Sequence, residues 1–309
     1  MMPLFSVVIP VFNRAGLLRQ AIASVLSQTE QDFEIIVVDD GSSDDPQSVV
    51  SECADARIVF VRQPNRGGGP ARNTGIDLAR GRFVAFLDSD DRFLPHHLAA
   101  MRALLESNPG SAGYARMVVD RGDGVTILKP PRGIAAGEDM ANYLMCDRGF
   151  VPTSTVVVER AVAQAIRYPD DLAASEDTDF AIRAALAGTR FLMIEEPGAI
   201  CRDLRDPARL SSGRRGATIG DWLEGLRPSI PARAYFGCRG WSYAKFVATR
   251  SRPEALKLYL TALGHRCYRP SLAVIIFLQI FLSDDAYRRL ADGAISHLGA
   301  GLRRVRHHG

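Results

Sequence analysis

Short apolar runs alternate with stretches of helical periodicity over the first hundred residues of the chain. Four of these runs have the composition of strands that are covered on both faces of a sheet: Phe5 to Val11, Phe33 to Val38, Arg57 to Val61 and Phe83 to Leu87. A helical stretch follows each run, at Leu17 to Leu26, Gln47 to Cys53, Ala71 to Ala79 and Pro95 to Glu106. This alternation predicts a mostly parallel sheet with right-handed crossovers.

The pattern changes beyond about Ser111. Shorter strand-like pieces then appear between Gly and Pro residues, at Met117 to Asp120, Val125 to Leu128, Ser154 to Val158 and Phe191 to Ile194. A helix is expected from near Asp177 to Gly188, and a loop from Arg202 to Gly216. Residues 217–309 lose the strand pattern. We therefore expect an α/β domain at residues 1–215, with a central sheet flanked by helices, and a helical C-terminal region at 216–309 that contacts an acceptor, a second copy or a membrane surface.

Two apolar segments of the C-terminal region have alternative interpretations. Leu272 to Leu282 is about half as long as the roughly 20 residues that cross a bilayer, which favours a buried helix, with an interfacial helix as the alternative. The last segment forms a helical stripe bordered by arginines: Leu290, Ala294, Ile295, Leu298, Leu302 and Val305. Such a helix docks on the protein with its charged face in solvent, lies on an anionic membrane, or pairs two copies as a homodimer.

Composition narrows the class of protein without identifying it. With 309 residues, 47% hydrophobic and 24% charged, the chain is typical of a globular protein with a sizeable core. A net charge of +3 gives no indication of a nucleic-acid partner. The five cysteines lack metal-site spacing and cannot all pair within one chain, which favours free thiols in a reducing compartment. The N-terminal run lacks the basic segment of a secretory signal, so we expect a cytoplasmic protein. Such a protein can also contact the inner face of the membrane peripherally.

An acid cluster directly follows the most apolar of the predicted strands. Phe83 to Leu87 is followed by Asp88, Ser89, Asp90 and Asp91, at the edge where open α/β sheets bind ligands. Clustered carboxylates repel one another unless a cation compensates them, so this position predicts a divalent metal beside a phosphorylated substrate. A calcium loop is the competing interpretation, but the glycine expected at its sixth position is Phe93 here.

Polar turns after the other strands bring candidate nucleotide-binding residues to the same edge. Phe12 offers a flat apolar face to a base, and Asp40 a carboxylate for an imide N–H; the alternatives are a core aromatic and a turn residue that bonds its own backbone. Gly67 to Gly69 allows backbone to approach a ligand closely. Arg72 follows on the first turn of a helix, near its positive end.

Taken in order, these segments resemble family 2 glycosyltransferases, which have the GT-A fold, a Rossmann-like α/β fold. The resemblance covers roughly residues 4 to 205 and rests on five motifs: Ser6 to Arg14, Val38 to Ser42, Asn65 to Gly75, Leu87 to Asp91 and Glu176 to Phe180. It implies an inverting enzyme that moves a sugar from a nucleotide-diphospho-sugar to the hydroxyl of a glycan or lipid-linked glycan acceptor, in polysaccharide or cell-envelope glycan synthesis.

The resemblance also implies roles for single residues. The nucleoside pocket is expected at Pro10, Phe12, Arg14 and Asp40, and a carboxylate at Asp40 suits the uracil or thymine of a UDP- or dTDP-sugar. Arg72 is placed near the donor diphosphate, with Arg66 as a second candidate. In the D-x-D motif, Asp90 is the direct ligand of Mg²⁺ or Mn²⁺, and Asp88 contacts the metal, its waters or the sugar–ribose part of the donor.

The catalytic base implied by the family pattern is Asp177. A carboxylate beside the acceptor hydroxyl must be ionised to take its proton, and a position at a helix N-terminus favours that form. Plain helix capping is the structural alternative for this Asp. Together with the metal ligands, Asp177 completes the set of residues expected for metal-assisted single displacement.

Two departures from the family pattern concern the acceptor side. Ala165 to Asp171 replaces a common Gly-Gly-Phe-Asp-Glu stretch, and Cys201 to Leu204 replaces a Tyr-Arg-x-His motif, so that the diphosphate charge is left to Arg202, Arg205 or Arg209. Two other functions therefore stay open. A nucleotidyltransferase would carry a glycine-rich loop ending in Lys after the first strand, whereas Pro10 to Gly16 has one Gly and no Lys. A degenerate glycan-binding or scaffold protein would keep the fold without the transfer.

Overall fold

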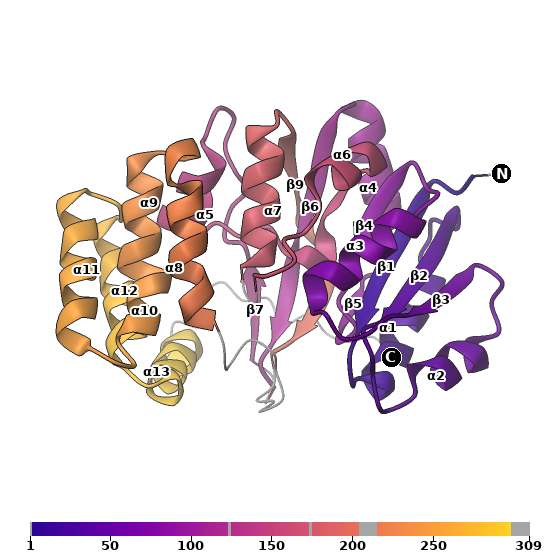
Figure 1. Cartoon of the computed structure of the whole chain (residues 1–309), viewed down its shortest axis with the longest axis horizontal. Coiled ribbons are helices and arrows are strands. Elements are labelled where there is room, and N and C mark those ends of the chain that lie inside the picture. The colour runs from indigo at the N-terminus through magenta and orange to yellow at the C-terminus, as the bar shows by residue number, and fades with distance from the viewer. Residues whose placement is uncertain (1, 123–124, 173–174, 204–214, 298–309) are drawn as a thin grey trace.

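A computed structural model describes residues 2–122, 125–172, 175–203 and 215–297. Within them a nine-stranded sheet runs in the order β3, β2, β1, β4, β8, β6, β9, β5, with β7 paired to β6. Helices pack on both faces of this sheet, and a group of C-terminal helices lies beside it (Figure 1). The expected α/β architecture with a helical C-terminal region is confirmed.

The four strands predicted in the first hundred residues form one continuous parallel part of the sheet. β1 (Phe5–Val11) pairs with β2 (Phe33–Asp39) and β4 (Phe83–Phe86), and β2 pairs with β3 (Ile58–Arg62), all in parallel. Because parallel strands end at the same edge, the turns after β1, β2 and β4 meet there. This edge carries the predicted nucleotide and metal residues.

Alternation of side chains along β1 divides the interior into two cores. Val7 and Ile9 face a core shared with α1 and α4, whereas Val8 faces a core shared with α3 and α7. Both faces are thus covered, which explains why the strands are apolar throughout. The helices of this part are α1 (Ala15–Leu26), α2 (Pro46–Cys53), α3 (Gly68–Leu78), α4 (His97–Ser107), α5 (Met140–Cys146), α6 (Arg160–Ile166) and α7 (Glu176–Leu186).

The strands in the second half of the sheet begin and end at other residues than the sequence predicts. Its strands are β5 (Asp91–Phe93), β6 (Ser111–Asp120), β7 (Thr126–Lys129), β8 (Val157–Glu159) and β9 (Arg190–Arg202). β6 begins six residues before the predicted Met117, because its small residues are buried between neighbouring strands. β9 continues past Ile194 through a register shift opposite Ala115 and Arg116. The predicted strand at Ser154 becomes the 3₁₀ turn η1 (Thr153–Thr155) before the short β8.

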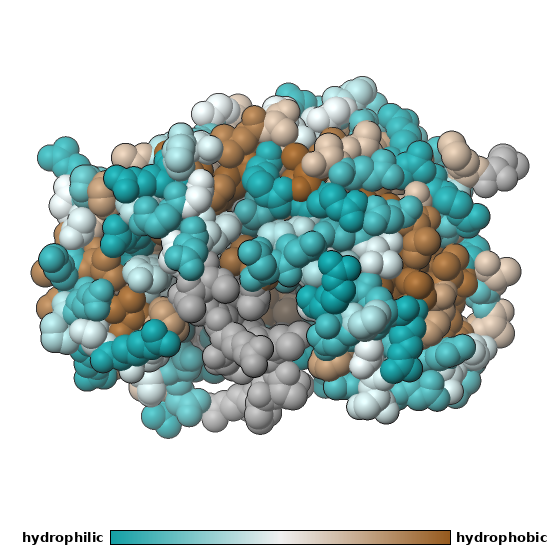
Figure 2. Space-filling model, in the orientation of Figure 1, coloured by the Kyte–Doolittle hydropathy of each residue, from teal (hydrophilic) through white to brown (hydrophobic). Residues whose placement is uncertain are grey.

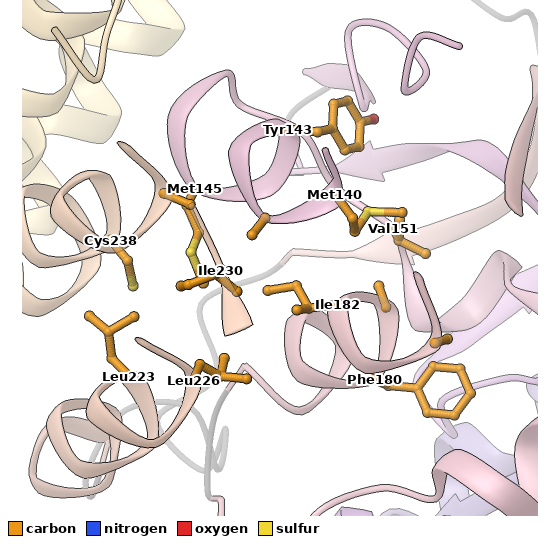
Figure 3. Close-up of a cluster of buried hydrophobic side chains, with 14 of the residues drawn as sticks. Met140, Tyr143, Met145, Val151, Phe180, Ile182, Leu223, Leu226, Ile230 and Cys238 are labelled. Atoms are coloured by element: carbon orange, nitrogen blue, oxygen red, sulfur yellow. The ribbon is translucent and has the colours of Figure 1, made fainter. Parts of the chain in front are cut away.

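The C-terminal helices pack on α5 and α7 and extend one of the two cores. They are α8 (Arg215–Leu226), α9 (Ala232–Cys238), η4 (Arg239–Tyr243), α10 (Ala244–Val247), α11 (Arg252–Gly264), α12 (Pro270–Phe281) and α13 (Asp284–His297), with a 3₁₀ turn, η3 (Arg227–Ser229), after α8. Figure 3 shows Leu223, Leu226 and Ile230 lying against Met145 and Ile182 in one buried cluster. The boundary near residue 215 therefore separates two regions that share a core.

The predicted apolar segment Leu272 to Leu282 coincides with α12 and is buried on one side only. Leu272, Ile276 and Ile280 are in the core, whereas Val274 is 60% exposed and Phe277 41% exposed. Apolar atoms show at the surface of this end of the molecule in Figure 2. None of the helices in the described residues is both long and apolar enough to cross a membrane.

The basic tail is described only as far as α13. Arg288 on α13 donates to the carboxylate of Asp203 at 3.0 Å, which ties the helix to the end of β9. Leu290, on the predicted stripe, is 58% exposed. The remainder of the stripe from Leu298 lies outside the described residues. So do residues 204–214 of the loop predicted at Arg202 to Gly216, whereas Arg202 ends β9 and Arg215 begins α8. None of the five cysteines, all within the described residues, takes part in a disulfide, in agreement with the expectation.

Candidate active site

The turns after β1 and β2 are fastened to each other at the edge of the sheet. Asn13 has a left-handed backbone with φ +52°, and its side-chain oxygen accepts a hydrogen bond from the Ser43 N–H at 2.8 Å. Its own N–H donates to the Ser42 hydroxyl at 2.9 Å. Pro10 and Phe12 flank this turn as half-buried residues, so that Phe12 is neither a core aromatic nor fully exposed.

Asp40 is buried beneath the glycine loop and holds it in place. Its carboxylate accepts hydrogen bonds from the backbone N–H of Arg66 at 2.9 Å and of Gly67 at 2.8 Å, and from the Gln63 amide at 2.8 Å. These three bonds use most of the roughly four acceptor positions of a carboxylate, and Asp40 is only 3% exposed. The base-reading role of Asp40 stays a prediction, and the contacts in the structure show that Asp40 holds the glycine loop.

The glycine loop packs so closely on another segment that a side chain does not fit. A Cβ added at Gly69 would lie 2.3 Å from the carbonyl oxygen of Pro169. Gly67 has φ +99°, a left-handed conformation that favours glycine. The loop is therefore fixed by sterics and by Asp40, and it starts α3 with its N–H groups at the edge of the sheet.

Arg72 connects the glycine-loop helix with two acidic side chains from distant segments. Its guanidinium donates to Asp88 at 2.6 Å and to Glu176 at 2.8 Å, while Arg72 itself is only 8% exposed. Burial works against the charge of Arg72, but the charges of Asp88 and Glu176 more than offset it and raise the pKa of Arg72. The guanidinium also lies over the ring of Tyr168, 5.1 Å from its centre.

The other acid of the D-x-D motif faces a second arginine. Arg14 Nη1 lies 2.6 Å from Asp90 Oδ2, and both side chains are mostly buried. Arg14 and Asp90, which the sequence assigned to the nucleoside and to the metal, are thus in direct contact. Each carboxylate of the D-x-D motif has a cation beside it, as the repulsion between clustered acids requires.

Asp91 and Ser154 support the acid cluster from below. The Ser154 hydroxyl donates to Asp91 at 2.6 Å and accepts the N–H of Asp88 at 3.1 Å. Burial and the neighbouring charges of Asp88 and Asp90 raise the pKa of Asp91 far above its ordinary range. No sequence motif marks Ser154, because its partners are more than sixty residues away in the chain.

Asp177 lies in the first turn of α7, next to Glu176. Its carboxylate accepts the N–H of Thr178 at 2.7 Å and the Thr178 hydroxyl at 3.3 Å. Burial raises the pKa of Asp177 above its ordinary value, although the bonds from Thr178 and the charge of Arg72 act against burial. The residue before α7's first turn, Ser175, is left-handed with φ +69° and makes no side-chain cap.

The two segments that depart from the family pattern differ in what the structure shows of them. In the Ala165 to Asp171 segment, Tyr168 stacks on Phe180 with ring centres 4.7 Å apart and exchanges two hydrogen bonds of 2.8 Å with Asn73. The segment therefore positions Arg72 through Tyr168 and Asn73, and no sequence motif indicated this role. Arg66 lies 3.6 Å from Asp170 at the surface, and Arg202 ends β9, whereas Arg205 and Arg209 lie outside the described residues.

The acid pair suits a divalent cation only in combination with a ligand. Among the described residues, no three His, Cys, Asp or Glu side chains are grouped to hold a metal by themselves. Mg²⁺ is commonly bound by one or two carboxylates together with substrate phosphates. The hard oxygens of Asp88 and Asp90 fit that arrangement.

This sheet order with its edge of acids is that of the GT-A glycosyltransferase fold. The structure of Staphylococcus aureus TarS 1-349 in complex with UDP-GlcNAc matches this chain with a TM-score of 0.66 and 19% identity. The match covers 95% of this chain and 92% of that one, and at this identity it shows a shared fold alone. The family model for glycosyl transferase family 2 matches residues 6–166. The chain belongs to this family and is a glycosyltransferase.

Two curated relatives illustrate the similarity in sequence. The amylovoran biosynthesis glycosyltransferase AmsB of Erwinia amylovora is 29% identical over 243 residues, which is 74% of this chain and 79% of the relative. WfaP of Escherichia coli, a UDP-Glc:alpha-D-GlcNAc-diphosphoundecaprenol beta-1,3-glucosyltransferase, is 28% identical over 170 residues, or 54% of this chain and 65% of the relative.

Proposed function

We propose that this chain is an inverting glycosyltransferase that moves a hexose from a nucleotide-diphospho-sugar to an acceptor hydroxyl in a single displacement. The observation that carries the proposal is the separation of its carboxylates into two environments. Asp88 and Asp90 each face an arginine at the end of β4, whereas Asp177 is bonded to Thr178 at the start of α7. Acids with different surroundings have different roles in catalysis.

In this proposal the donor lies across the edge of the sheet. Phe12 and Pro10 border the base, Asp40 accepts an imide N–H through its remaining acceptor position, and a UDP- or dTDP-sugar is favoured. The diphosphate lies near the glycine loop at the start of α3 and near Arg72. Asp90 and Asp88 would hold Mg²⁺ or Mn²⁺, which supplies charge neutralisation for the departing diphosphate when it is bound.

Asp177 is the proposed base. Its carboxylate takes the proton of the acceptor hydroxyl while the acceptor oxygen forms a bond to the anomeric carbon, and the bond from that carbon to the diphosphate oxygen breaks. A raised pKa brings a carboxylate nearer to the operating pH, which improves it as a base. Thr178 keeps the carboxylate oriented through its N–H and hydroxyl.

The acceptor is proposed to be a glycan or a lipid-linked glycan, as the name of WfaP states for that enzyme. The helical region at 216–309 then serves the acceptor side, and its exposed apolar residues Leu260, Val274 and Phe277 suit peripheral contact with the inner membrane face. Binding of the full-length protein to anionic vesicles at low salt tests this contact. No binding contradicts it, and a dimer in sedimentation would assign the same surface to a second copy.

Sugar transfer from a panel of UDP- and dTDP-hexoses, with Mn²⁺ or with EDTA, tests the function. Loss of a general base typically lowers rate by about 10²- to 10⁴-fold, which is the effect expected for Asp177→Asn. A folded Asp177→Asn enzyme with full rate would refute the base. Release of pyrophosphate from a nucleoside triphosphate and a sugar phosphate would indicate a nucleotidyltransferase, and no donor hydrolysis with any sugar nucleotide would indicate a glycan-binding protein.

A further inference from the structure

A small pocket lies between α7 and the C-terminal helices. Its volume is about 100 Å³, and its wall combines two tryptophans with three hydroxyl side chains: Trp222, Trp241, Ser175, Thr178 and Ser242. Trp222 comes from α8 and Trp241 from η4, so the pocket exists only where the α/β part meets the helical region. Ser242 is exposed at its rim.

The pocket is directly connected to the proposed base. Thr178, in its wall, is the residue whose N–H and hydroxyl bond the Asp177 carboxylate. Ser175, also in the wall, has the left-handed backbone that begins α7. Non-glycine residues in this conformation occur preferentially where a site needs a defined geometry. A molecule in the pocket therefore contacts the residue that holds this carboxylate.

Both indoles are partly buried against the core and are held by hydrogen bonds from their ring N–H groups. Trp222 Nε1 donates to the buried carboxylate of Asp179 at 2.8 Å, and Asp179 is itself paired with Arg183. Trp241 Nε1 donates to Gln279 on α12 at 2.8 Å. Since the N–H of each ring is already used, each side chain is a rigid apolar surface, which is what pre-organised ligand sites require.

The helix that carries Trp241 and Ser242 changes its winding at this point. η4 is a π-helical segment between α9 and α10, and all three form one continuous helix, as the helical backbone of Cys238 and Tyr243 shows. π-Helical turns inside α-helices are rare, and many of those known lie at functional sites. The irregular turn brings Trp241 and Ser242 to the pocket.

We infer that this pocket is the subsite for the pyranose ring of the acceptor. A pyranose has an apolar C–H face that packs on an indole and hydroxyls around its edge that hydrogen-bond Ser and Thr side chains. The pocket offers both kinds of surface next to Asp177 and takes part of one ring. The inference rests on the proposed function, and it assigns acceptor binding to Trp241, Trp222 and Ser242.

Tryptophan fluorescence reports on this pocket directly, because Trp222 and Trp241 are the only tryptophans in the chain. Titration with methyl N-acetyl-α-D-glucosaminide, in the absence of donor, should give a saturable change in intensity or wavelength, and glycerol at the same concentrations should not. Ser242→Gln, which narrows the pocket from an exposed position, should abolish the change. A wild-type titration with no saturable signal for any methyl hexoside or N-acetylhexosaminide would overturn the subsite.

Kinetics with an octyl glycoside acceptor provide the second test. For Trp241→Ala we expect the acceptor KM to rise roughly tenfold, equivalent to about 1.4 kcal/mol of binding, while the donor KM changes by less than about twofold. Trp241→Phe, which keeps an aromatic face, should recover much of the loss and guards against misfolding. Leu78→Ala, a truncation of an exposed apolar side chain at the end of α3, is the control and should behave as wild type.

The outcomes separate the subsite from the proposed function. Transfer that is normal in Trp241→Ala and in Ser242→Gln would overturn the subsite and leave the glycosyl transfer intact. A saturable fluorescence change in a protein that neither binds nor hydrolyses any nucleotide sugar would support the pocket as a sugar site and overturn the transfer.

Discussion

Arg72 offers the most direct test of how the active site is held together. Arg72→Met removes the buried cation shared by Asp88 and Glu176, whose side chains are 34% and 20% exposed, and leaves both carboxylates without this partner. Removing one partner of a buried ion pair typically costs about 3–5 kcal/mol of unfolding free energy. For a chain of this size, roughly 2 °C per kcal/mol predicts a melting temperature about 6–10 °C lower.

The loss should be partly recovered by removing an acid as well. Glu176→Gln alone leaves Arg72 paired with Asp88, so we expect a cost of about 1–3 kcal/mol. In the double variant Arg72→Met/Glu176→Gln, only Asp88 keeps a charge without its partner. Because the two residues are in contact, the loss of unfolding free energy should be smaller than the sum of the two single losses by about 0.5–3 kcal/mol. Urea unfolding followed by circular dichroism, without donor or metal, measures all three free energies.

The matched control is Arg167→Met. Arg167 makes two hydrogen bonds to Asp77, at 2.6 and 3.0 Å, with both side chains largely exposed. A solvent-exposed pair contributes at most about 1 kcal/mol, so the same substitution should have little effect there. If Arg72→Met and Arg167→Met shift the unfolding midpoint equally, or if the double variant shows strict additivity, then burial of the Arg72 network does not stabilise the site.

Two further predictions concern the base and the glycine loop. Burial raises the pKa of Asp177, and a base must be ionised to take a proton, so kcat/KM should fall as the pH is lowered through a midpoint above the ordinary Asp value of about 3.9. A midpoint at or below that value in the pH profile would contradict Asp177 as the base. Gly69→Ala forces a Cβ against Pro169 and should lower stability by about 1–3 kcal/mol and raise the donor KM. Gly225→Ala, where an added Cβ meets none of the described atoms within 4 Å, should show neither change in a thermal melt or a donor titration.

The parallel half of the sheet was predictable because its strands are uniformly apolar and separated by clear helical stretches. β5 was not, because its three residues include Asp91 and continue an acid cluster that reads as a turn. The start of β6 was missed for a related reason: small residues such as Ala112 and Gly113 carry little strand propensity, and burial in the sheet decides their conformation. α5 and α6 are seven residues each, too short for helical periodicity to stand out.

Local motifs indicated the candidate site residues but not their partners. Arg14 and Asp90 are 76 positions apart, and Arg72 and Glu176 are 104 apart, so their contacts depend on the sheet order and not on spacing in the chain. Trp222 and Trp241 lie in the region without strand pattern, where no motif marked them. Their position beside Thr178 follows from the packing of α8 and η4 on α7.

The core shared by α5, α7 and the C-terminal helices limits how such an enzyme can be recombined. Leu226 and Ile230 pack against side chains of the α/β part, so a cut near residue 215 exposes apolar surface on both pieces. A chimera that exchanges the C-terminal helices therefore has to carry α5 and the face of α7 with them. Under the proposed acceptor role of these helices, a change of acceptor requires matched substitutions within one core and not the exchange of a module.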